Sequence, residues 1–162
     1  MNIIIKNHHL LYKGYKLKCA IGKMGLNYLK KEGDLTTPKG LFRIGLLYYR
    51  RDRIKLPYCS IKKKIITKNM GWCNDPKSKY YNKEIKISNK LKHEKLFRKD
   101  HIYNYLIVIN YNTKKIISNK GSAIFIHLTK GYKKTAGCVS IKQKDFLILI
   151  KLINKKTKIK IC

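Results

Sequence analysis

Several residue types are scarce in this chain of 162 residues, and these shortages restrict the classes of protein to which it can belong. Valine occurs twice, alanine three times and proline three times, and 8 acidic residues stand against 39 lysines and arginines. No apolar run approaches the length needed to span a membrane. The apolar stretch before Lys6 has three residues, far short of a signal-peptide core, so we expect no recognisable export signal.

The number and spacing of the cysteines do not favour disulfide bonds or a zinc ribbon. The five cysteines are Cys19, Cys59, Cys73, Cys138 and Cys162. An odd number cannot all pair within the chain, and no C-x-x-C motif is present. The sequence therefore predicts neither a disulfide framework nor a zinc ribbon.

The net charge of +31 predicts affinity for anions such as nucleic acid, anionic lipid or an acidic polymer. However, the cations are 34 lysines and only 5 arginines, and isoleucine occurs 24 times. That skew is typical of an AT-rich coding sequence. A specific nucleic-acid reader would rely more on arginine, whose planar fork fits phosphates and guanine edges. We predict contact with an anionic polymer but no specific nucleic-acid recognition, although coding bias does not fully explain the shortage of acids.

The length and a hydrophobic content of 44% predict one globular domain over residues 1–162. Short β-rich segments recur along the chain, with Lys13 and Gly14 as a hairpin turn. The expected strands are 2–6, 9–12, 15–21, 41–49, 61–68, 105–111, 114–118, 122–128 and 157–162, the pair 105–111 and 114–118 forming a hairpin around Asn112 and Thr113. Residues 70–82 are expected to form an irregular loop. Trp72 in this loop either fills the core or lines a site, and the core position (a core plug) is favoured.

Two segments have helical character. Residues 93–99 fit one or two helical turns, and residues 141–156 form a long amphipathic stretch without glycine or proline that suits a helix packed on a sheet. No alternation of strands with helices is seen. The fold class is therefore mainly β with one long helix near the C-terminus, an α+β domain rather than a doubly wound one.

The most informative stretch is residues 121–141, GSAIFIHLTKGYKKTAGCVSI. An apolar strand ends near His127, and a small polar loop leads to Cys138. Ser140 and Gln143 fit a capping box, which would place Cys138 beside a helix N-terminus and lower the pKa of its thiol. The two residues are then a nucleophile and its base, with a backbone carbonyl orienting the imidazole. Two alternatives stay open: a metal site, which lacks a third ligand, and simple packing.

Several segments resemble one known family. TTPKGLFRIG (36–45), GSAIFIHLTK (121–130) and TAGCVSI (135–141) are similar to the catalytic domain of L,D-transpeptidases, the YkuD-type fold. The segments EGD (32–34), YRRDR (49–53), GWCNDP (71–76), YYN (80–82) and 93–112 resemble a short, single-domain branch of it. The resemblance covers nearly the whole chain in order and implies a β-sandwich with mixed sheets.

The resemblance also implies roles. Cys138 would be the nucleophile and His127 the general base in acyl transfer on peptidoglycan stem peptides, without cofactor or metal. Substrate contacts are expected at Ser122, Thr135, Trp72, Arg51 and Arg53, the alternatives being turn hydroxyls, core packing and solvated charge. Gly137 and Cys138 would supply oxyanion donors.

The sequence departs from the family pattern at two positions. Ala136 stands where most members have histidine, and Ser140 stands where many have arginine. These departures bear on substrate placement more than on the nucleophile. The family implies a periplasmic or cell-wall location, and a cytoplasmic one stays open because no export signal is seen. Other open functions are a cysteine peptidase or amidase with another substrate, and a non-catalytic basic protein that binds nucleic acid.

Overall fold

The computed structural model describes residues 1–88 and 90–162 and consists mainly of β-strands with one helix. Its elements follow the chain as β1 (Ile3–Lys6), β2 (His9–Tyr12), β3 (Tyr15–Ala20), β4 (Leu26–Asn27), β5 (Thr37–Pro38), β6 (Gly40–Tyr49), β7 (Lys63–Ile65), β8 (Met70–Cys73), β9 (Glu84–Lys86), β10 (His93–Lys95), β11 (Tyr105–Ile109), β12 (Phe125–Leu128), β13 (Val139–Ile141), α1 (Gln143–Leu152) and β14 (Lys158–Ile161). The predicted fold class is confirmed.

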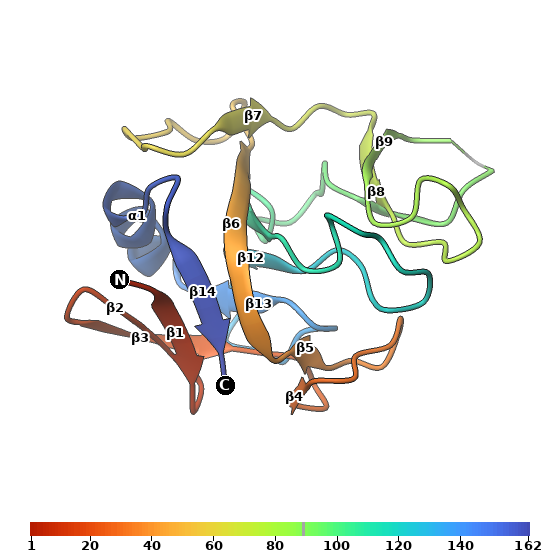
Figure 1. The fold of residues 1–162 in the computed structure, drawn as a ribbon. Helices are drawn as coiled ribbons and strands as arrows, with labels where there is room; N and C mark the ends of the chain where they lie inside the picture. Colours follow the sequence, from red (N-terminus) through yellow and green to blue (C-terminus); the bar gives the residue numbers. More distant parts are fainter. Residues whose placement is uncertain (89) are drawn as a thin grey trace.

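The main sheet is mixed and folds back on itself. Its order is β11-β12-β13-β3-β2-β1-β14-β6-β7, and the long strand β6 also pairs with β11. The first half of β6 pairs with β14 and its second half with β11. In Figure 1, β6 therefore runs the height of the molecule and joins the β1–β2–β3–β14 half to the β11–β12–β13 half. The predicted hairpin turn at Lys13 and Gly14 is present, with both residues at positive φ.

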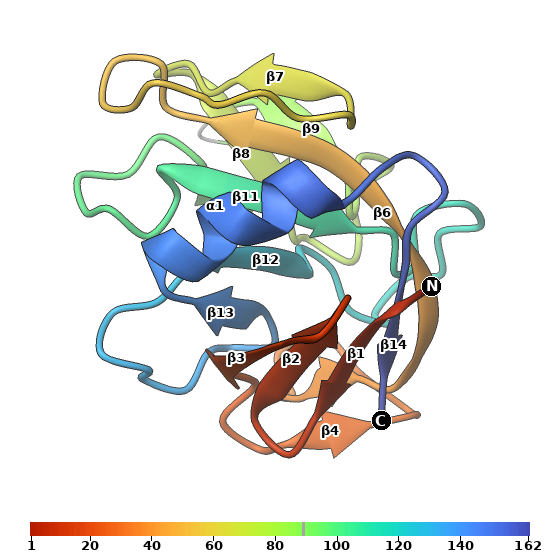
Figure 2. The same cartoon turned by 90° about the vertical axis from the view of Figure 1, so that its left-hand side faces the viewer.

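Two apolar cores form around the β11–β12–β13 half of the sheet. Helix α1 lies across these strands in Figure 2 and contributes Phe146, Leu149 and Ile150 to the larger core. Trp72 and Phe125 belong to the smaller core, which also includes Cys138. Because alternate residues of a strand face opposite sides, β12 contributes Phe125 to the smaller core and Ile126 and Leu128 to the larger one. The smaller core carries the site described below.

Several local predictions are wrong. Residues 70–82 are not irregular throughout, because Met70–Cys73 form strand β8, which pairs with β9 and β10. Residues 93–99 form no helical turn, because His93–Lys95 are strand β10 and pair with β8. Residues 114–118 form no strand, since Asn112 adopts a φ of 51° and its side chain binds the Ile117 amide and carbonyl, which holds a loop. Tertiary pairing and one turn residue outweigh the local pattern in these places.

A further error concerns the capping box. Ser140 lies inside β13, the helix begins at Gln143, and its N-cap is Lys142 without a side-chain hydrogen bond. The helix is also shorter than the predicted stretch. A strand therefore separates Cys138 from the helix N-terminus.

Asn82 ties the smaller core together. Its Oδ1 accepts hydrogen bonds from Trp72 Nε1 at 2.9 Å and from the Ala123 amide at 3.0 Å. Its Nδ2 donates to the carbonyls of Tyr111 and Asn112 at 3.1 and 2.7 Å. All of these groups are far from Asn82 in sequence except Trp72. One buried amide thus fixes the loop before β12 against β8.

We predict that Asn82→Ala lowers the free energy of unfolding by about 3 kcal/mol, because buried donors and acceptors lose their partners. Urea denaturation measures this loss. The matched control is Asn69→Ala, at an exposed asparagine, where a change below about 0.5 kcal/mol is expected. Equal effects of the two substitutions would contradict the role given to Asn82.

Candidate active site

The parallel pairing of β12 with β13 builds the site. Ile126 lies opposite Val139, and His127 lies opposite Ser140. Ile126 and Val139 face the larger core, so His127 and Ser140 face the other side of the sheet. Cys138 comes one residue before β13 and faces that same side, where its sulfur contacts the smaller core. His127 and Cys138 are therefore diagonal neighbours on one face.

The thiol of Cys138 is held in place by backbone. It donates to the Ala123 carbonyl at 3.2 Å, and its sulfur accepts from the Phe125 amide at 3.4 Å. Ala123 has a φ of 52°, a left-handed conformation that is uncommon for a residue with a side chain. Although only 8% exposed, Cys138 lines a cavity of about 660 Å³ that His127 also lines. Cys138 is therefore buried but borders this cavity.

The imidazole of His127 is oriented as predicted, by a backbone carbonyl. Its Nδ1 donates to the Leu128 carbonyl at 2.8 Å, which leaves Nε2 with a free lone pair when the ring is neutral. The ring packs edge-on against Tyr103 at a centroid distance of 5.3 Å. This tautomer is the one a general base needs.

Burial sets the protonation of both groups. It raises the pKa of the Cys138 thiol to about 12, with a smaller contribution from the Glu94 charge, and the Lys30 charge and the Phe125 amide only partly oppose it. Burial also lowers the pKa of His127 to about 4, although the Leu128 carbonyl opposes this. At neutral pH the pair is an uncharged thiol beside an uncharged imidazole. The prediction of a lowered thiol pKa is wrong, because no helix end lies next to Cys138.

The turn before Cys138 is rigid. Thr135 Oγ1 donates to the Cys138 carbonyl at 2.6 Å and accepts from the Gly137 amide at 3.1 Å. Gly137 has a φ of 148°, and a Cβ there would lie 2.8 Å from the Thr36 carbonyl oxygen, so no other residue fits without movement. Thr37 Oγ1 donates to the Gly137 carbonyl at 2.8 Å. Thr135 is thus the turn hydroxyl of the alternative reading, and the Gly137 amide already has a partner.

The sequence profile of the L,D-transpeptidase catalytic domain, YkuD, matches residues 2–161. The chain belongs to this family. Comparison with curated proteins and with solved structures gave no match. The family acts on peptidoglycan and is typically found in the periplasm or at the cell wall.

Three predicted substrate contacts of this YkuD domain lie elsewhere. Trp72 is buried against Tyr48 and Phe125 and lines a separate cavity of about 540 Å³. Arg53 donates to the carbonyls of Lys99 and Asp100, and with Arg51 it lines a hollow beside β7. None of the three lines the cavity that holds Cys138. Trp72 is the core plug favoured by the sequence, and Arg53 holds a loop.

Of the predicted substrate contacts, Thr135 and Ser122 do line the cavity that holds Cys138, and Ser122 is the one with an unpaired hydroxyl among the described residues. Its side chain lines the cavity, and its Oγ is buried without a hydrogen-bond partner among the described residues. The Tyr81 hydroxyl lies close by, but the two groups do not meet hydrogen-bond geometry. Ser140 Oγ and Asn74 Oδ1 are also buried without a hydrogen-bond partner among the described residues, and both residues line the same cavity. Buried polar atoms without protein partners are uncommon, and these three face a cavity in which a ligand or water can complete their hydrogen bonds.

Sequence reasoning missed the charged lining of the cavity. Lys30, Glu32, Glu94 and Arg98 all contribute to it. Tyr103 donates to Glu94 and Tyr81 donates to Glu32, so each carboxylate is fixed by a tyrosine. Glu32 and Glu94 are distant in sequence, but the fold brings them to one cavity.

The described residues contain no group of three or more histidine, cysteine, aspartate or glutamate side chains arranged to hold a metal ion. Nor does any helix within residues 1–88 and 90–162 have the length and apolarity to cross a bilayer.

The raised pKa makes a spectroscopic prediction. The difference in ultraviolet thiolate absorbance between the wild type and Cys138→Ala should be absent at pH 7. It should develop only above about pH 10, because the thiol loses its proton near pH 12. A Cys162→Ala variant, which changes a partly exposed cysteine, serves as the reference. A Cys138 thiolate signal at neutral pH would contradict the neutral pair.

Proposed function

We propose that this YkuD domain is an L,D-transpeptidase that uses Cys138 to transfer acyl groups from peptidoglycan stem peptides. When water replaces the acceptor amine, the same chemistry gives L,D-carboxypeptidase activity. The observation that carries the proposal is that a thiol and an imidazole with a free Nε2 line one cavity on the same sheet face. Cysteine nucleophiles need such a base within reach.

The first half-reaction forms a thioester. His127 Nε2 takes the proton of Cys138 as the sulfur attacks the carbonyl carbon of the third stem residue, a diaminopimelate. The tetrahedral oxyanion is stabilised by the backbone amide of Cys138, the remaining donor of the predicted pair. As the intermediate collapses, the imidazolium gives its proton to the nitrogen of the terminal D-alanine, which leaves as a free amine.

The second half-reaction releases the acyl group. His127 takes a proton from the amine of a neighbouring stem, or from water, and that nucleophile attacks the thioester carbonyl. The C–S bond breaks, the sulfur regains the proton from the imidazolium, and a cross-linked or shortened stem leaves. The Leu128 carbonyl keeps Nδ1–H in place through both steps, so Nε2 alone exchanges protons.

The neutral resting pair supports this order of events. A charged thiolate and imidazolium would both be poorly solvated in this site, since burial opposes each charge. Proton transfer is therefore coupled to the arrival of a carbonyl, which disperses the charge of the sulfur. The thiol stays neutral until a substrate fills the cavity.

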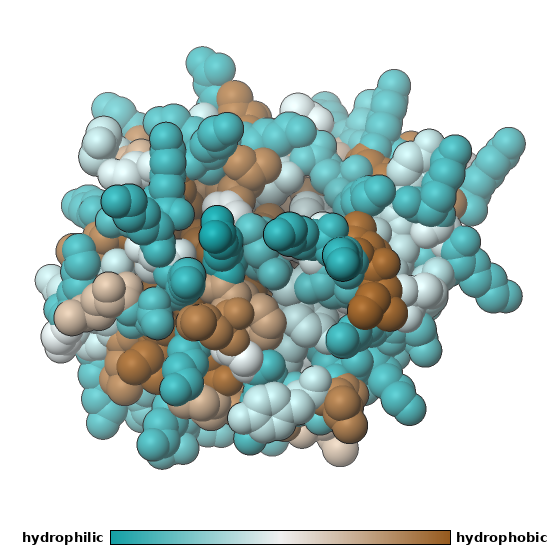
Figure 3. Space-filling view, in the orientation of Figure 1, coloured by the Kyte–Doolittle hydropathy of each residue, from teal (hydrophilic) through white to brown (hydrophobic). Residues whose placement is uncertain are grey.

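The charges of the cavity fit a zwitterionic peptide better than a nucleic acid. Glu32 and Glu94 line it together with several cations, and carboxylates repel phosphate. Lysines outside the cavity give the molecule its strongly hydrophilic surface, seen over the face in Figure 3. These lysines suit weak contacts with an anionic wall polymer, and we place the protein in the periplasm or at the cell wall, where its substrate lies.

The test is incubation of the purified protein with muropeptides, read by mass spectrometry. Dimers would report transpeptidation, and stems shortened by one alanine would report carboxypeptidation. We expect Cys138→Ala to abolish both and His127→Gln to lower kcat/KM by about 10²- to 10⁴-fold, the usual contribution of a general base. A carbapenem should add its mass to the wild type but not to Cys138→Ala.

Cys162→Ala is the matched control and should retain wild-type activity, since Cys162 does not line the cavity. A wild type that forms no product and no carbapenem adduct would refute the proposal. Salt-sensitive retention on DNA that Cys138→Ala leaves unaltered would, in that event, favour the non-catalytic alternative.

The pH dependence follows from the lowered pKa of His127. A protonated imidazole cannot accept the thiol proton, so kcat/KM should fall only as pH drops towards about 4. No inflection is expected between pH 6 and 8, because both groups stay neutral there. A steady-state profile measures this, and an acid limb centred near the ordinary histidine pKa of about 6.5 would contradict it.

A further inference from the structure

Lys30 is a lysine that the fold has buried. Its side chain is 3% exposed, and its Nζ donates to Asp34 Oδ1 at 2.7 Å and to the Lys31 carbonyl at 3.4 Å. An ammonium group has three N–H donors, so one remains. Lys30 lines the cavity that holds Cys138. Removing a lysine from water is costly, which makes this placement informative among so many solvated lysines.

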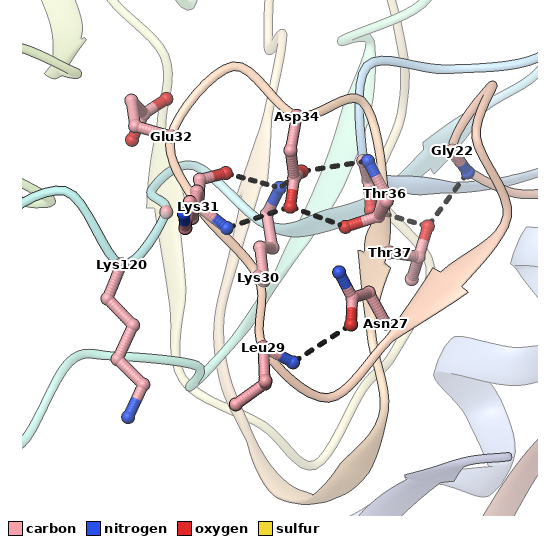
Figure 4. Close-up of polar contacts among 12 residues, drawn as sticks. Gly22, Asn27, Leu29, Lys30, Lys31, Glu32, Asp34, Thr36, Thr37 and Lys120 are labelled. Carbon is pink, nitrogen blue, oxygen red and sulfur yellow. Dashed lines mark hydrogen bonds and ion pairs between the residues drawn. The ribbon is translucent and has the colours of Figure 1, made fainter.

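Asp34 is fixed so that it stays charged beside Lys30. Its carboxylate also accepts from the Lys31 amide at 2.7 Å, the Thr36 amide at 2.9 Å and Thr36 Oγ1 at 2.8 Å. Burial alone would raise its pKa, but the hydrogen bonds from Lys30, Thr36 and Lys31 lower it to about 2. Figure 4 shows this carboxylate between the three donor residues. Its charge is shared over several donors, which leaves the ammonium only partly neutralised.

The ammonium lies directly against the turn before Cys138. A Cβ on Gly137 would be 3.5 Å from Lys30 Nζ, and a Cβ on Gly121 would be 2.8 Å from Lys30 Cε. Two glycines therefore make room for this side chain. Residues 136, 137, 139 and 140 around Cys138 are alanine, glycine, valine and serine, so the turn itself brings no charge. Lys30 supplies the positive charge that the turn lacks.

Ser122 adds a second, independent observation. It follows Gly121, is 6% exposed, and its Oγ has no hydrogen-bond partner within the described part of the chain. Because Lys30 packs against Gly121, its ammonium and the Ser122 hydroxyl enter the cavity from the same end. Ser122 lies three residues before Phe125, whereas His127 lies two residues after Phe125. An anion held there would sit on the opposite side of Cys138 from the base.

We propose that Lys30 and Ser122 form a carboxylate-binding subsite beside Gly137, which receives a carboxylate of the acyl-transfer substrate. The subsite deepens the proposed function and rests on it for the identity of the substrate. The ammonium donates its third N–H and the serine its hydroxyl proton to the two carboxylate oxygens. Asp34 is a positioning residue that holds the ammonium in the cavity.

The test compares alkylation of Cys138 by iodoacetate, which carries a carboxylate, with alkylation by neutral iodoacetamide. Mass spectrometry of the Cys138 peptide gives both rates at one pH, and their ratio cancels changes in thiol reactivity. Lys30→Gln should lower the iodoacetate-to-iodoacetamide ratio about tenfold, and Ser122→Ala should lower it less. Lys30→Arg should keep most of the ratio, and Asp34→Asn should keep or raise it.

Lys133→Gln and Lys134→Gln are matched controls, because each removes one exposed lysine from the same cavity. Both should leave the ratio within about twofold, since exposed charges are screened. If Lys30→Gln folds poorly, the double variant Lys30→Gln/Asp34→Asn removes the ion pair without leaving a buried carboxylate unpaired, and the same fall is expected. A ratio unchanged by loss of Lys30, or lowered equally by the controls, overturns the subsite.

A binding measurement separates this proposal from the proposed function. Titration of ¹⁵N-labelled wild type with N-acetyl-D-alanine should shift the Ser122 and Gly137 amide resonances, whereas N-acetyl-D-alaninamide should not. Lys30→Gln should lose the response. A wild type that forms neither product nor a carbapenem adduct would refute the cysteine mechanism while the titration still reports the subsite. Equal shifts with acid and amide, or none with either, would refute the subsite alone.

Discussion

The parallel pairing of β12 with β13 is the constraint on which the site depends. Ile126 lies opposite Val139, and both face the helix-covered core. Their neighbours along the chain, which include His127 and Cys138, therefore face away from that core. A shift of one residue in this register would turn His127 or Cys138 into that core. The register is fixed because Ile126 and Val139 are fully buried there and because Ser140 and Ile141 pair with β3. Apolar packing on one face thus sets the chemistry of the other.

Burial of the site has opposite consequences for order and for reactivity. The backbone contacts to the sulfur and the carbonyl bound to Nδ1 hold the pair in one geometry. The same lack of solvent raises the thiol pKa and lowers the imidazole pKa, which suppresses the ion pair. A buried neutral thiol is protected from rapid alkylation and oxidation, because the thiolate is the reactive form. Selectivity for a substrate that fills the cavity follows from that protection.

The sequence was sufficient for the elements and residues whose signals are local. The hairpin at Lys13 and Gly14, the strand that carries His127 and the glycine before Cys138 are all defined within a few residues of chain. The carbonyl that orients His127 comes from the next residue, Leu128. The Ser140 capping box failed because strand pairing with β12 and β3 competes with helix initiation at the same residues.

What the sequence could not supply are contacts between distant segments. The site receives Lys30 from a loop near the N-terminus and Glu94 from β10, and neither position has a local pattern that points to Cys138. The family resemblance implied substrate contacts at Arg51 and Arg53, yet Arg53 donates hydrogen bonds to the carbonyls of a loop. Only the fold shows which charges converge, since a run of cations in sequence has the same appearance whether or not it reaches a site.

In a chain with 39 lysines and arginines, burial and the cavity that a side chain lines separate structural cations from functional ones. Arg50 is as buried as Lys30, but its guanidinium binds both oxygens of Asp52 and the Arg98 carbonyl and stacks on Phe97 at 3.5 Å. Those partners belong to the protein, and Arg50 does not line the Cys138 cavity. Lys30 keeps a donor and faces the cavity. The energetic cost of burying a lysine there is offset when a ligand carboxylate completes its hydrogen bonds, which is the condition for a binding residue rather than a structural one.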